Sequence, residues 1–367
     1  MDELTIQSGS CYAIFAYDAA RSINLDLAER RIHEATQRQT IKQKRRAPSY
    51  FEYQPLPLRV SQEVEPLHLG NYVGSSIVDL VVYDFGAISV IYNFPIEGPL
   101  AQLRGLSEEL YGNESLLNDS RIRIDYILKM VGDAASQSGI ADVVEDYLIF
   151  SVDAFNPVLH ADRLCELHGH DIAQILRAEQ QPLSKQEIGE ALGARISYGT
   201  EDLIIADWNA ALVVDADGED VRSVLEFANV ELLEMRYLDH RLDRALEQAY
   251  EMLSRRSWRS AGIFRSYAAD LRKVAELEVD NATLFEGVNN TLKLIGDQYL
   301  ARVYRLANRR FHLDDWDGSI LRKLQTLHSI YEITASQATN RRMEILEWVI
   351  IVLIAFSVII EILPRLH

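Results

Sequence analysis

Two segments of the chain repeat one pattern of apolar and polar positions. Residues 79–93 read DLVVYDFGAISVIYN, and residues 202–215 read DLIIADWNAALVVD. Each segment begins with Asp-Leu, continues through an apolar run to a second Asp and an aromatic residue, and ends in another apolar run. Two apolar runs around a short turn are typical of a β-hairpin. We therefore expect two similar hairpins, and we interpret the repeated pattern as structural rather than catalytic.

Other segments of the first part of the chain show strand and helix patterns. Short apolar runs predict strands at Cys11–Asp18 and Glu145–Val152. Helical periodicity is typical of residues 23–35, 160–177 and 184–192, and Ser184 and Glu187 have the spacing of a capping box. A polar, basic and proline-bearing stretch at about residues 36–57 predicts a linker. These elements predict an α+β (mixed) head over residues 1–218, built from two similar hairpin–helix units.

From Glu219 onward the pattern becomes helical. Apolar residues keep helical spacing over residues 219–344, and breaks fall near residues 257–262 and 312–319. This predicts a section of long antiparallel helices that resembles a stalk or coiled coil. A narrow apolar stripe of this kind can pack on itself or on a second copy of the chain, so we expect a homo-oligomer.

The most apolar segment lies at residues 345–363, which read ILEWVIIVLIAFSVIIEIL. Nineteen helical residues span roughly 28 Å, close to the thickness of the hydrocarbon core of a bilayer. The segment therefore predicts a C-terminal transmembrane anchor. The candidate anchor residues are the basic pair before the span, the apolar and aromatic residues at its start and the acids near its ends: Arg341, Arg342, Leu346, Glu347, Trp348 and Glu361. A buried core helix and an oligomer-forming helix are the alternatives.

Composition and charge argue against several classes of function. The 367 residues include 55 acids and 37 bases, for a formal net charge of -18. Such a surface repels phosphate, so direct nucleic-acid binding is not expected. Cys11 and Cys165 are the two cysteines, which form no disulfide framework and suit a reducing compartment. The first ten residues, MDELTIQSGS, do not resemble a secretory signal, and the basic pair before the span places the body on the cytoplasmic side.

Candidate chemistry is sparse. Asp84-Phe85-Gly86 spells a kinase magnesium motif, but no other kinase motif accompanies it, so it is interpreted as a hairpin turn. His160, His168 and His170 form a candidate metal cluster, because imidazole suits zinc, although no paired ligand motif such as HExxH accompanies them. The aspartates of residues 314–317 are interpreted as helix-capping residues. No catalytic residue and no cofactor are expected.

Basic clusters leave a third hypothesis open. They occupy residues 42–46, the surroundings of Trp258 and one helical pattern, and comprise Lys42, Lys44, Arg45, Arg46, Arg255, Arg256, Arg259, Arg302, Arg305, Arg309 and Arg310. They could contact RNA or the ribosome. Ion pairs with the many acids of the same chain are the simpler interpretation.

The C-terminal segment and the first hairpin resemble a known family. NRRMEILEWVIIVLIAFSVIIEIL is similar to the C-terminal signature of the "required for meiotic nuclear division" family, a domain of unknown function with bacterial, fungal and mitochondrial members. VVYDFGAISVIYNF resembles the hairpin motif of that family, carried here by Phe85, Gly86, Ala87, Val90, Tyr92 and Asn93. At the second hairpin, Asp207-Trp208-Asn209 keeps only part of the pattern of the relatives.

The resemblance implies a membrane-anchored, non-catalytic protein, since mitochondrial relatives lie at the inner membrane and support translation. The first hypothesis is therefore a scaffold or tether at a bacterial inner membrane. Its soluble part would face the cytoplasm, and its partners would be membrane lipid, other copies of the chain and an unidentified protein, for which the resemblance suggests a role in translation. A metal-dependent enzyme or sensor and an RNA- or ribosome-associated factor are the alternatives.

Overall fold

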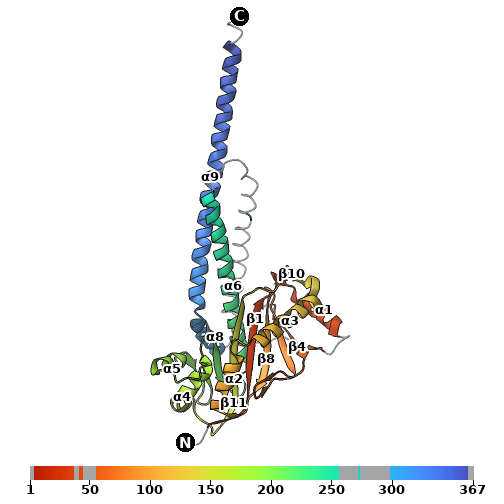
Figure 1. Cartoon of the computed structure of the whole chain (residues 1–367), viewed down its shortest axis with the longest axis vertical. Helices are drawn as coiled ribbons and strands as arrows, with labels where there is room; N and C mark the ends of the chain where they lie inside the picture. Colours follow the sequence, from red (N-terminus) through yellow and green to blue (C-terminus); the bar gives the residue numbers. More distant parts are fainter. Residues whose placement is uncertain (1–3, 37–40, 44–54, 256–271, 273–297, 363–367) are drawn as a thin grey trace. The chain divides into compact units, whose positions relative to one another are not determined.

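The structure is a computed structural model that describes residues 4–36, 41–43, 55–255, 272 and 298–362 (Figure 1). Within these ranges, the side chains of residues 34–36, 41–43, 252–255, 331, 333–342, 344–345 and 357–362 also lie outside the described set. The chain divides into two compact units, residues 1–238 with 283–317 and residues 239–282 with 318–367. The boundary that the sequence predicts, after residue 218, is the start of α6 (Glu219–Arg255), whose first turns belong to the first unit.

A ten-stranded mixed sheet forms the centre of the first unit, as far as the described residues show. Its strand order is β12-β13-β14-β11-β1-β8-β7-β4-β3, and β9 (Gly98–Pro99) pairs with one end of β1. The two longest strands, β1 (Thr5–Asp18) and β11 (Val144–Asn156), are antiparallel neighbours at the centre. The predicted mixed fold class is confirmed, and the strands form one large sheet that was not predicted.

Both predicted hairpins are present and belong to this one sheet. The first consists of β7 (Ile77–Val82) and β8 (Ala87–Pro95), and the second of β13 (Leu203–Ala206) and β14 (Ala210–Val214). They lie on either side of the central pair. The order β1-β8-β7-β4 on one side corresponds to β11-β14-β13-β12 on the other, with β4 at Leu58–Glu63 and β12 at Arg195–Ile196.

The correspondence between the two halves does not extend to strand direction. β8 is antiparallel to β1, whereas β14 is parallel to β11. The reason lies in the connections, because a parallel pair needs a crossover, and α4 (Ala161–Arg177) and α5 (Lys185–Ala191) lie between β11 and the second hairpin. The two halves therefore share a strand order without being superimposable copies.

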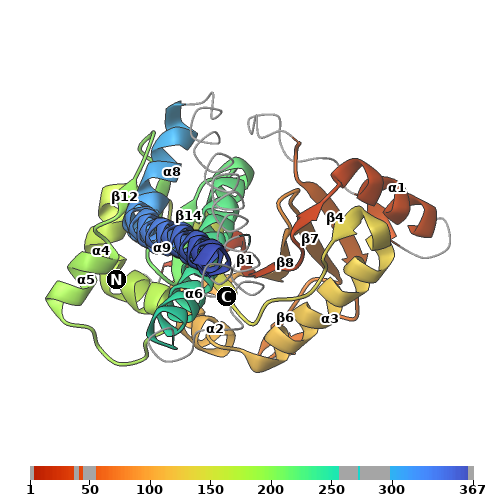
Figure 2. The ribbon, with the colours of Figure 1, turned by 90° about the horizontal axis from the view of Figure 1, so that it is seen from above.

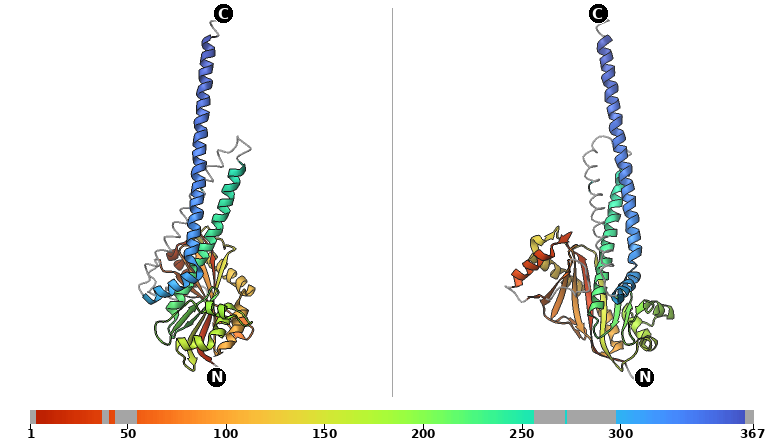
Figure 3. Two further views of the ribbon diagram at one scale, coloured as in Figure 1. Left: turned by 90° about the vertical axis from the view of Figure 1, so that its left-hand side faces the viewer. Right: turned by 180° about the vertical axis from the view of Figure 1, so that it is seen from behind.

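Helices cover both faces of the sheet. One face packs against α1 (Leu25–Thr36), α2 (Leu103–Leu110), α3 (Glu114–Val131) and α4, and the other packs against α6 and α8 (Gln298–Phe311). Figures 2 and 3 show α1 and α3 on the side of the strands away from α6. Alternation along β1 explains the two cores, since Phe15 and Tyr17 enter the first and Ile14 and Ala16 enter the second.

Short elements complete the first unit. The 3₁₀-helices Leu100–Gln102 and Gly132–Ala134 flank α2 and α3. Two small sheets pair β2 (Ser22–Ile23) with β10 (Ala135–Ser136), and β5 (His68–Leu69) with β6 (Tyr72–Val73). β3 (Ile41–Gln43) falls inside the predicted linker at 36–57, so that stretch contains a strand; most of its other residues are not described. Both cysteines are free, and Cys11 is buried.

The second unit contains the later turns of α6 and most of α9 (Leu313–Ile362). Lys323 on α9 forms ion pairs with Asp239 and Asp243 on α6, at 2.7 and 2.6 Å. Both helices belong to the predicted helical section and run in the same direction in Figure 1, and the antiparallel arrangement stays a prediction. Ion pairs of this kind contribute little to the free energy of folding. Their main effect here is to fix how the two helices align.

The predicted transmembrane anchor at 345–363 is wrong for the described part of the chain. Among the described residues, no helix is both long and apolar enough to cross a membrane. Of the proposed anchor residues, Leu346, Glu347 and Trp348 are exposed on α9. The side chains of Arg341, Arg342 and Glu361 lie outside the described residues.

The turn of the first hairpin has room for glycine alone. Gly86 has φ +108°, and a Cβ built there would lie 1.7 Å from the backbone oxygen of Ala20. The turn is held against the segment after β1 by two backbone hydrogen bonds, from Ala19 N to Gly86 O (3.1 Å) and from Ile23 N to Asp84 O (2.7 Å). The Asp84-Phe85-Gly86 motif is therefore a turn, as predicted, that docks on a neighbouring segment.

We predict that Gly86→Ala lowers the free energy of unfolding by about 2 kcal/mol or more, because the new methyl group collides with backbone and φ is unfavourable. Urea unfolding followed by circular dichroism measures the change. Gly139→Ala is the matched control, since a Cβ there meets no atom within 4 Å, and it should change stability by less than about 0.5 kcal/mol. Equal effects of the two substitutions would contradict this account of the turn.

Candidate functional site

A polar pocket of about 360 Å³ opens on the α6 face of the sheet, within the first unit. Its lining comes from strands β1, β4, β7, β8 and β11 and from the start of α6: Tyr12, Arg59, Ser75, Ile77, Asp79, Ile91, Asn93, Ser151, Asp153, Ala216, Asp217, Gly218, Glu219 and Arg222. The strand residues of the lining lie on the same face of the sheet, as shown by the direct pairing of Tyr12 with Asn93 and of Asp79 with Ile91. Polar side chains thus replace the apolar core at this end of the face.

A buried carboxylate fixes one wall of the pocket. Glu226 on α6 is 2 % exposed. Its Oε2 accepts a hydrogen bond from Arg59 Nη2 at 2.7 Å, and its Oε1 accepts one from Arg222 Nε at 3.1 Å. We call Arg59, Glu226 and Arg222 the arginine–glutamate triad. It joins β4 to α6, and charge-assisted hydrogen bonds to both carboxylate oxygens hold both guanidinium groups in fixed positions.

Both arginines of the triad have further partners. Arg59 Nη1 lies 3.5 Å from Asp79 Oδ2, and Arg222 Nη2 lies 3.6 Å from Glu219 Oε1. The guanidinium carbon of Arg222 also lies 4.3 Å from the centre of the Tyr12 ring. Burial alone lowers the pKa of Arg59, but the charges of Glu226 and Asp79 outweigh it and raise this pKa overall. Arg59 therefore remains charged, and carboxylates of the protein itself offset the charges of both guanidinium groups.

The carboxylates of Asp153 and Asp217 lie at the remaining side of the pocket, and a buried amide oxygen lies in its wall. Asn93 Oδ1 is buried and accepts no hydrogen bond from the described residues, although the backbone oxygen of Asn93 accepts one from Ser75 N at 2.7 Å. Asp153 and Asp217 are exposed and have no ion-pair partner among the residues that the structure describes. A buried acceptor without a partner is costly for the folded protein unless something binds to it. The pocket therefore offers the carboxylates of Asp153 and Asp217 to a donor-bearing ligand.

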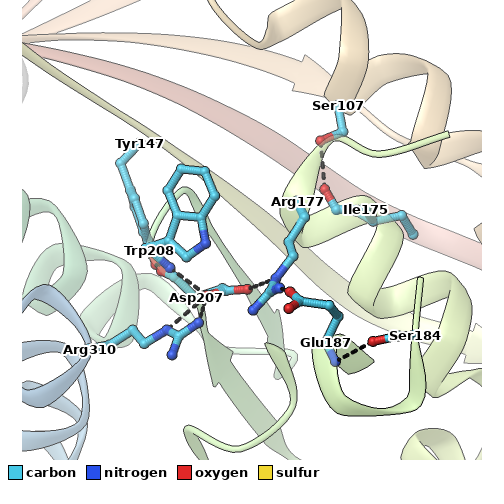
Figure 4. A network of polar contacts seen from close by, with 9 residues as sticks. All are labelled: Ser107, Tyr147, Ile175, Arg177, Ser184, Glu187, Asp207, Trp208 and Arg310. Carbon is cyan, nitrogen blue, oxygen red and sulfur yellow. Dashed lines mark hydrogen bonds and ion pairs between the residues drawn. The ribbon is translucent and has the colours of Figure 1, made fainter. Parts of the chain in front are cut away.

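A second polar network lies at the turn of the second hairpin (Figure 4). Asp207 is fully buried, and its carboxylate accepts hydrogen bonds from Arg177 Nε on α4 at 2.9 Å, from Arg310 Nε on α8 at 2.8 Å and from the backbone N–H of Trp208 at 2.8 Å. Arg177 also pairs with Glu187 on α5. One carboxylate thus connects the hairpin to helices on both faces of the sheet, so its role is structural.

Glu231 is a buried acid between α6 and α8. It accepts a hydrogen bond from the hydroxyl of Tyr304. Burial raises the pKa of Glu231 to about 8, and the charges of Asp314 and Asp317 add to this rise. The side chain is therefore protonated at neutral pH. A neutral carboxylic acid fits this apolar interface, whereas a carboxylate does not.

The structure places the predicted hairpin residues in different roles. Phe85, Gly86 and Ala87 form the turn and the start of β8, and the hydroxyl of buried Tyr92 donates to Asp119 Oδ2 on α3 at 2.6 Å. These four residues shape the fold. Asn93 alone among the predicted site residues lines the pocket.

The predicted histidine cluster does not converge. His160 precedes α4 as its N-cap residue, and His168 and His170 follow on the helix; His168 Nδ1 lies 4.0 Å from Asp171. Among the described residues, no three His, Cys, Asp or Glu side chains are grouped as a metal ion requires. The structure therefore gives the metal hypothesis no site within the described part of the chain.

The predicted basic clusters contribute one structural contact. Arg310 binds Asp207, and Arg305 Nε donates to the backbone of its own helix. Arg256, Arg259 and residues 44–46 lie outside the described residues, as do the side chains of Arg255 and Lys42. Asp314 and Asp315 lie in the first turn of α9, where the backbone N–H of Asp315 donates to His312 O at 3.0 Å; capping by the aspartate side chains stays a prediction.

Sequence patterns missed most of the pocket. Arg59, Asp79, Asp153, Arg222 and Glu226 were not among the candidate residues. The sequence did contain a sign of the pocket, because polar residues stand at strand positions that face a core. Asp79 interrupts the apolar strand IVDLVV, and Ser151 and Asp153 interrupt the end of β11. Polar residues at core-facing positions of a doubly covered sheet mark a site, because such positions are otherwise apolar.

Comparisons with known proteins give a family without an assigned function. The family model described as "Uncharacterized protein MJ0711, N-terminal domain" matches residues 8–220. The chain belongs to this family. The matched residues include the whole of the described sheet from β1 to β14 except its first three residues, and they supply most of the pocket lining. Naming the chain as a "required for meiotic nuclear division" protein is not confirmed by this match.

One curated relative resembles the chain over most of its length. It is "Uncharacterized protein MJ0711" of Methanocaldococcus jannaschii, 25% identical over 321 residues, which is 85% of this chain and 87% of the relative. The similarity therefore extends beyond the matched domain into the helical section. No solved structure matches the chain significantly.

We predict that Asp207→Asn lowers the free energy of unfolding by about 3–5 kcal/mol, since it leaves the charges of Arg177 and Arg310 without their buried partner. Urea unfolding measures the loss. Asp142→Asn, at an exposed position, is the control and should change stability by less than about 0.5 kcal/mol. A loss below about 1 kcal/mol for Asp207→Asn would show that the network is not a structural link.

We also predict a pH dependence from Glu231. Its folded pKa, about 8, lies above the ordinary value of 4.5. A raised pKa gives stability that is fully present below the unfolded value and is lost as the pH rises towards the folded one. Glu231→Gln should therefore gain stability relative to the natural protein between about pH 4.5 and pH 8. Exposed Glu247→Gln is the control, and parallel stability curves for all three proteins would refute the prediction.

Proposed function

We propose that the protein is a non-enzymatic binding protein whose pocket holds a ligand between the sheet and the start of α6. The observation that carries the proposal is the arginine–glutamate triad, which fixes one wall while Asn93 Oδ1 remains buried without a described partner. A rigid wall beside unsatisfied acceptors suits recognition, because little ordering is needed when the ligand binds.

The chemistry of the lining supports binding over catalysis. Among the described residues that line the pocket, none is His, Cys or Lys, the side chains that most often act as general bases or nucleophiles besides carboxylates and serine. Asp79 accepts a hydrogen bond from Ser61 and pairs with Arg59. Ser75 Oγ accepts a hydrogen bond from Ile77 N at 3.2 Å. These two groups act as structural supports in the proposal.

The proposal keeps the predicted scaffold role in part. The head would hold the ligand or partner, and the helical section would provide a separate surface for assembly with other copies. The resemblance of the first hairpin to the "required for meiotic nuclear division" family supports a link to translation only through Phe85, Gly86, Ala87, Tyr92 and Asn93. The homo-oligomer, the protein partner and the translation role stay predictions.

A ligand screen tests the proposal. We expect at least one class of small polar compound to raise the melting temperature of the natural protein and of the control Asn118→Ala, but not of Asn93→Ala. Asn118 is exposed on α3, far from the pocket lining. The compound should be recovered unchanged by mass spectrometry. Chemical conversion of the compound would contradict a non-enzymatic role, and equal stabilisation of all three proteins would contradict the pocket.

A further inference from the structure

The short helix α8 depends on its packing for its position. Its apolar face enters the core on the α6 side of the sheet through the buried residues Leu300, Val303, Tyr304, Ala307 and Phe311. A helix of 14 residues is marginal on its own in water, so these contacts hold it in place. The helix also covers the second hairpin, since Ile204, Ala211 and Val213 belong to the same core.

Polar contacts join α8 to the second hairpin and its flank. The hydroxyl of Tyr299 donates to Asp202 Oδ2 at 3.2 Å, and Arg310 Nε donates to the carboxylate of Asp207 at 2.8 Å. Burial alone raises the pKa of Asp202, but hydrogen bonds from backbone N–H groups outweigh it and lower this pKa overall. Asp207 is held by two arginines. Both contacts therefore use an ionised acid.

The contact between α8 and α6 is different, because it needs a neutral acid. The hydroxyl of Tyr304 donates to Glu231, which is 3 % exposed. No described Lys, Arg or His pairs with Glu231, and the charges that act on it are those of Asp314 and Asp317 at the start of α9. Glu234, another buried acid, follows one turn later on α6. A carboxylate at this place would be buried beside other acids, so packing of α8 on α6 favours the protonated form.

We propose that Glu231 is a pH-dependent switch, which holds α8 on α6 when it is protonated and loosens α8 when it is ionised. The folded pKa of Glu231 is about 8, against an ordinary value of 4.5. Between these two values each opening of α8 releases one proton from the carboxyl group to solvent, so a rising pH favours the open form. Burial and the charge of Asp314 also raise the pKa of Asp317, whose ionisation acts in the same direction. Opening exposes the apolar face of the second hairpin.

Hydrogen exchange of the full chain, measured by mass spectrometry at pH 5 and pH 8, tests the switch. Exchange rates are first corrected for the intrinsic effect of pH on amide exchange. The protection of α8 in the natural protein should fall about a hundredfold or more between the two pH values, while the protection of β11 changes little. In Glu231→Gln, whose side chain is neutral at both pH values, the protection of α8 should fall less than about threefold. The control Glu247→Gln, at an exposed position, should behave like the natural protein.

Three results would overturn the switch. An equal loss of α8 protection in the natural protein and in Glu231→Gln would show that another group carries the pH dependence. Constant protection of α8 in both proteins would show that ionisation does not open the helix. A parallel loss in α8 and β11 would mean that the whole unit unfolds. Glu231→Met is a second neutral variant and should also remove the pH dependence, so the test stands even if the amide of glutamine disturbs the packing.

Discussion

The pocket face of this protein depends on one carboxylate. Glu226 is buried on α6 and binds Arg59 from the sheet and Arg222 from its own helix. Without it, two guanidinium groups would face each other near a buried sheet surface, and α6 would lose its polar contact with β4. With it, the arginines are neutralised and immobile, and the acceptors around them determine what the pocket can bind. Removing one member of such a group leaves an uncompensated charge.

Asp207 has the corresponding role at the second hairpin. It is fully buried and holds Arg177 and Arg310, which come from helices on opposite faces of the sheet. The two carboxylates differ in what lies beside them. Asp207 is enclosed by structural partners, including the hydroxyl of Tyr147 on its backbone oxygen, whereas the Glu226 triad borders a cavity. The same physical device, one acid between two arginines, therefore fixes the fold at one place and shapes a site at another.

Local patterns predicted the elements well. Both hairpins, the strand at Glu145–Val152 and the Ser184 cap are present, because turn chemistry and alternation are local properties of the sequence. The parallel pairing of β11 with β14 was not predictable in this way. It depends on the crossover through α4 and α5, and strand alternation carries no information about direction.

The site was largely hidden from sequence reasoning. The hydrogen bond between Arg59 and Glu226 joins residues 167 positions apart, and no spacing rule connects them. Asn93 was named because it ends a motif, but its place beside Tyr12 follows from the register of β1 against β8. The apolar run at 345–363 was interpreted as a membrane anchor from its apolar composition, its length, its flanking charges and the family resemblance, an expectation that the described helices do not support.

The measurement that tests the account most directly is a crystal structure of the protein soaked with the compound that the ligand screen selects. The account predicts density for the compound in the pocket, with Arg59, Glu226 and Arg222 unmoved. An empty pocket, or the compound found only on the outer surface, would contradict the claim that this pocket is the functional site.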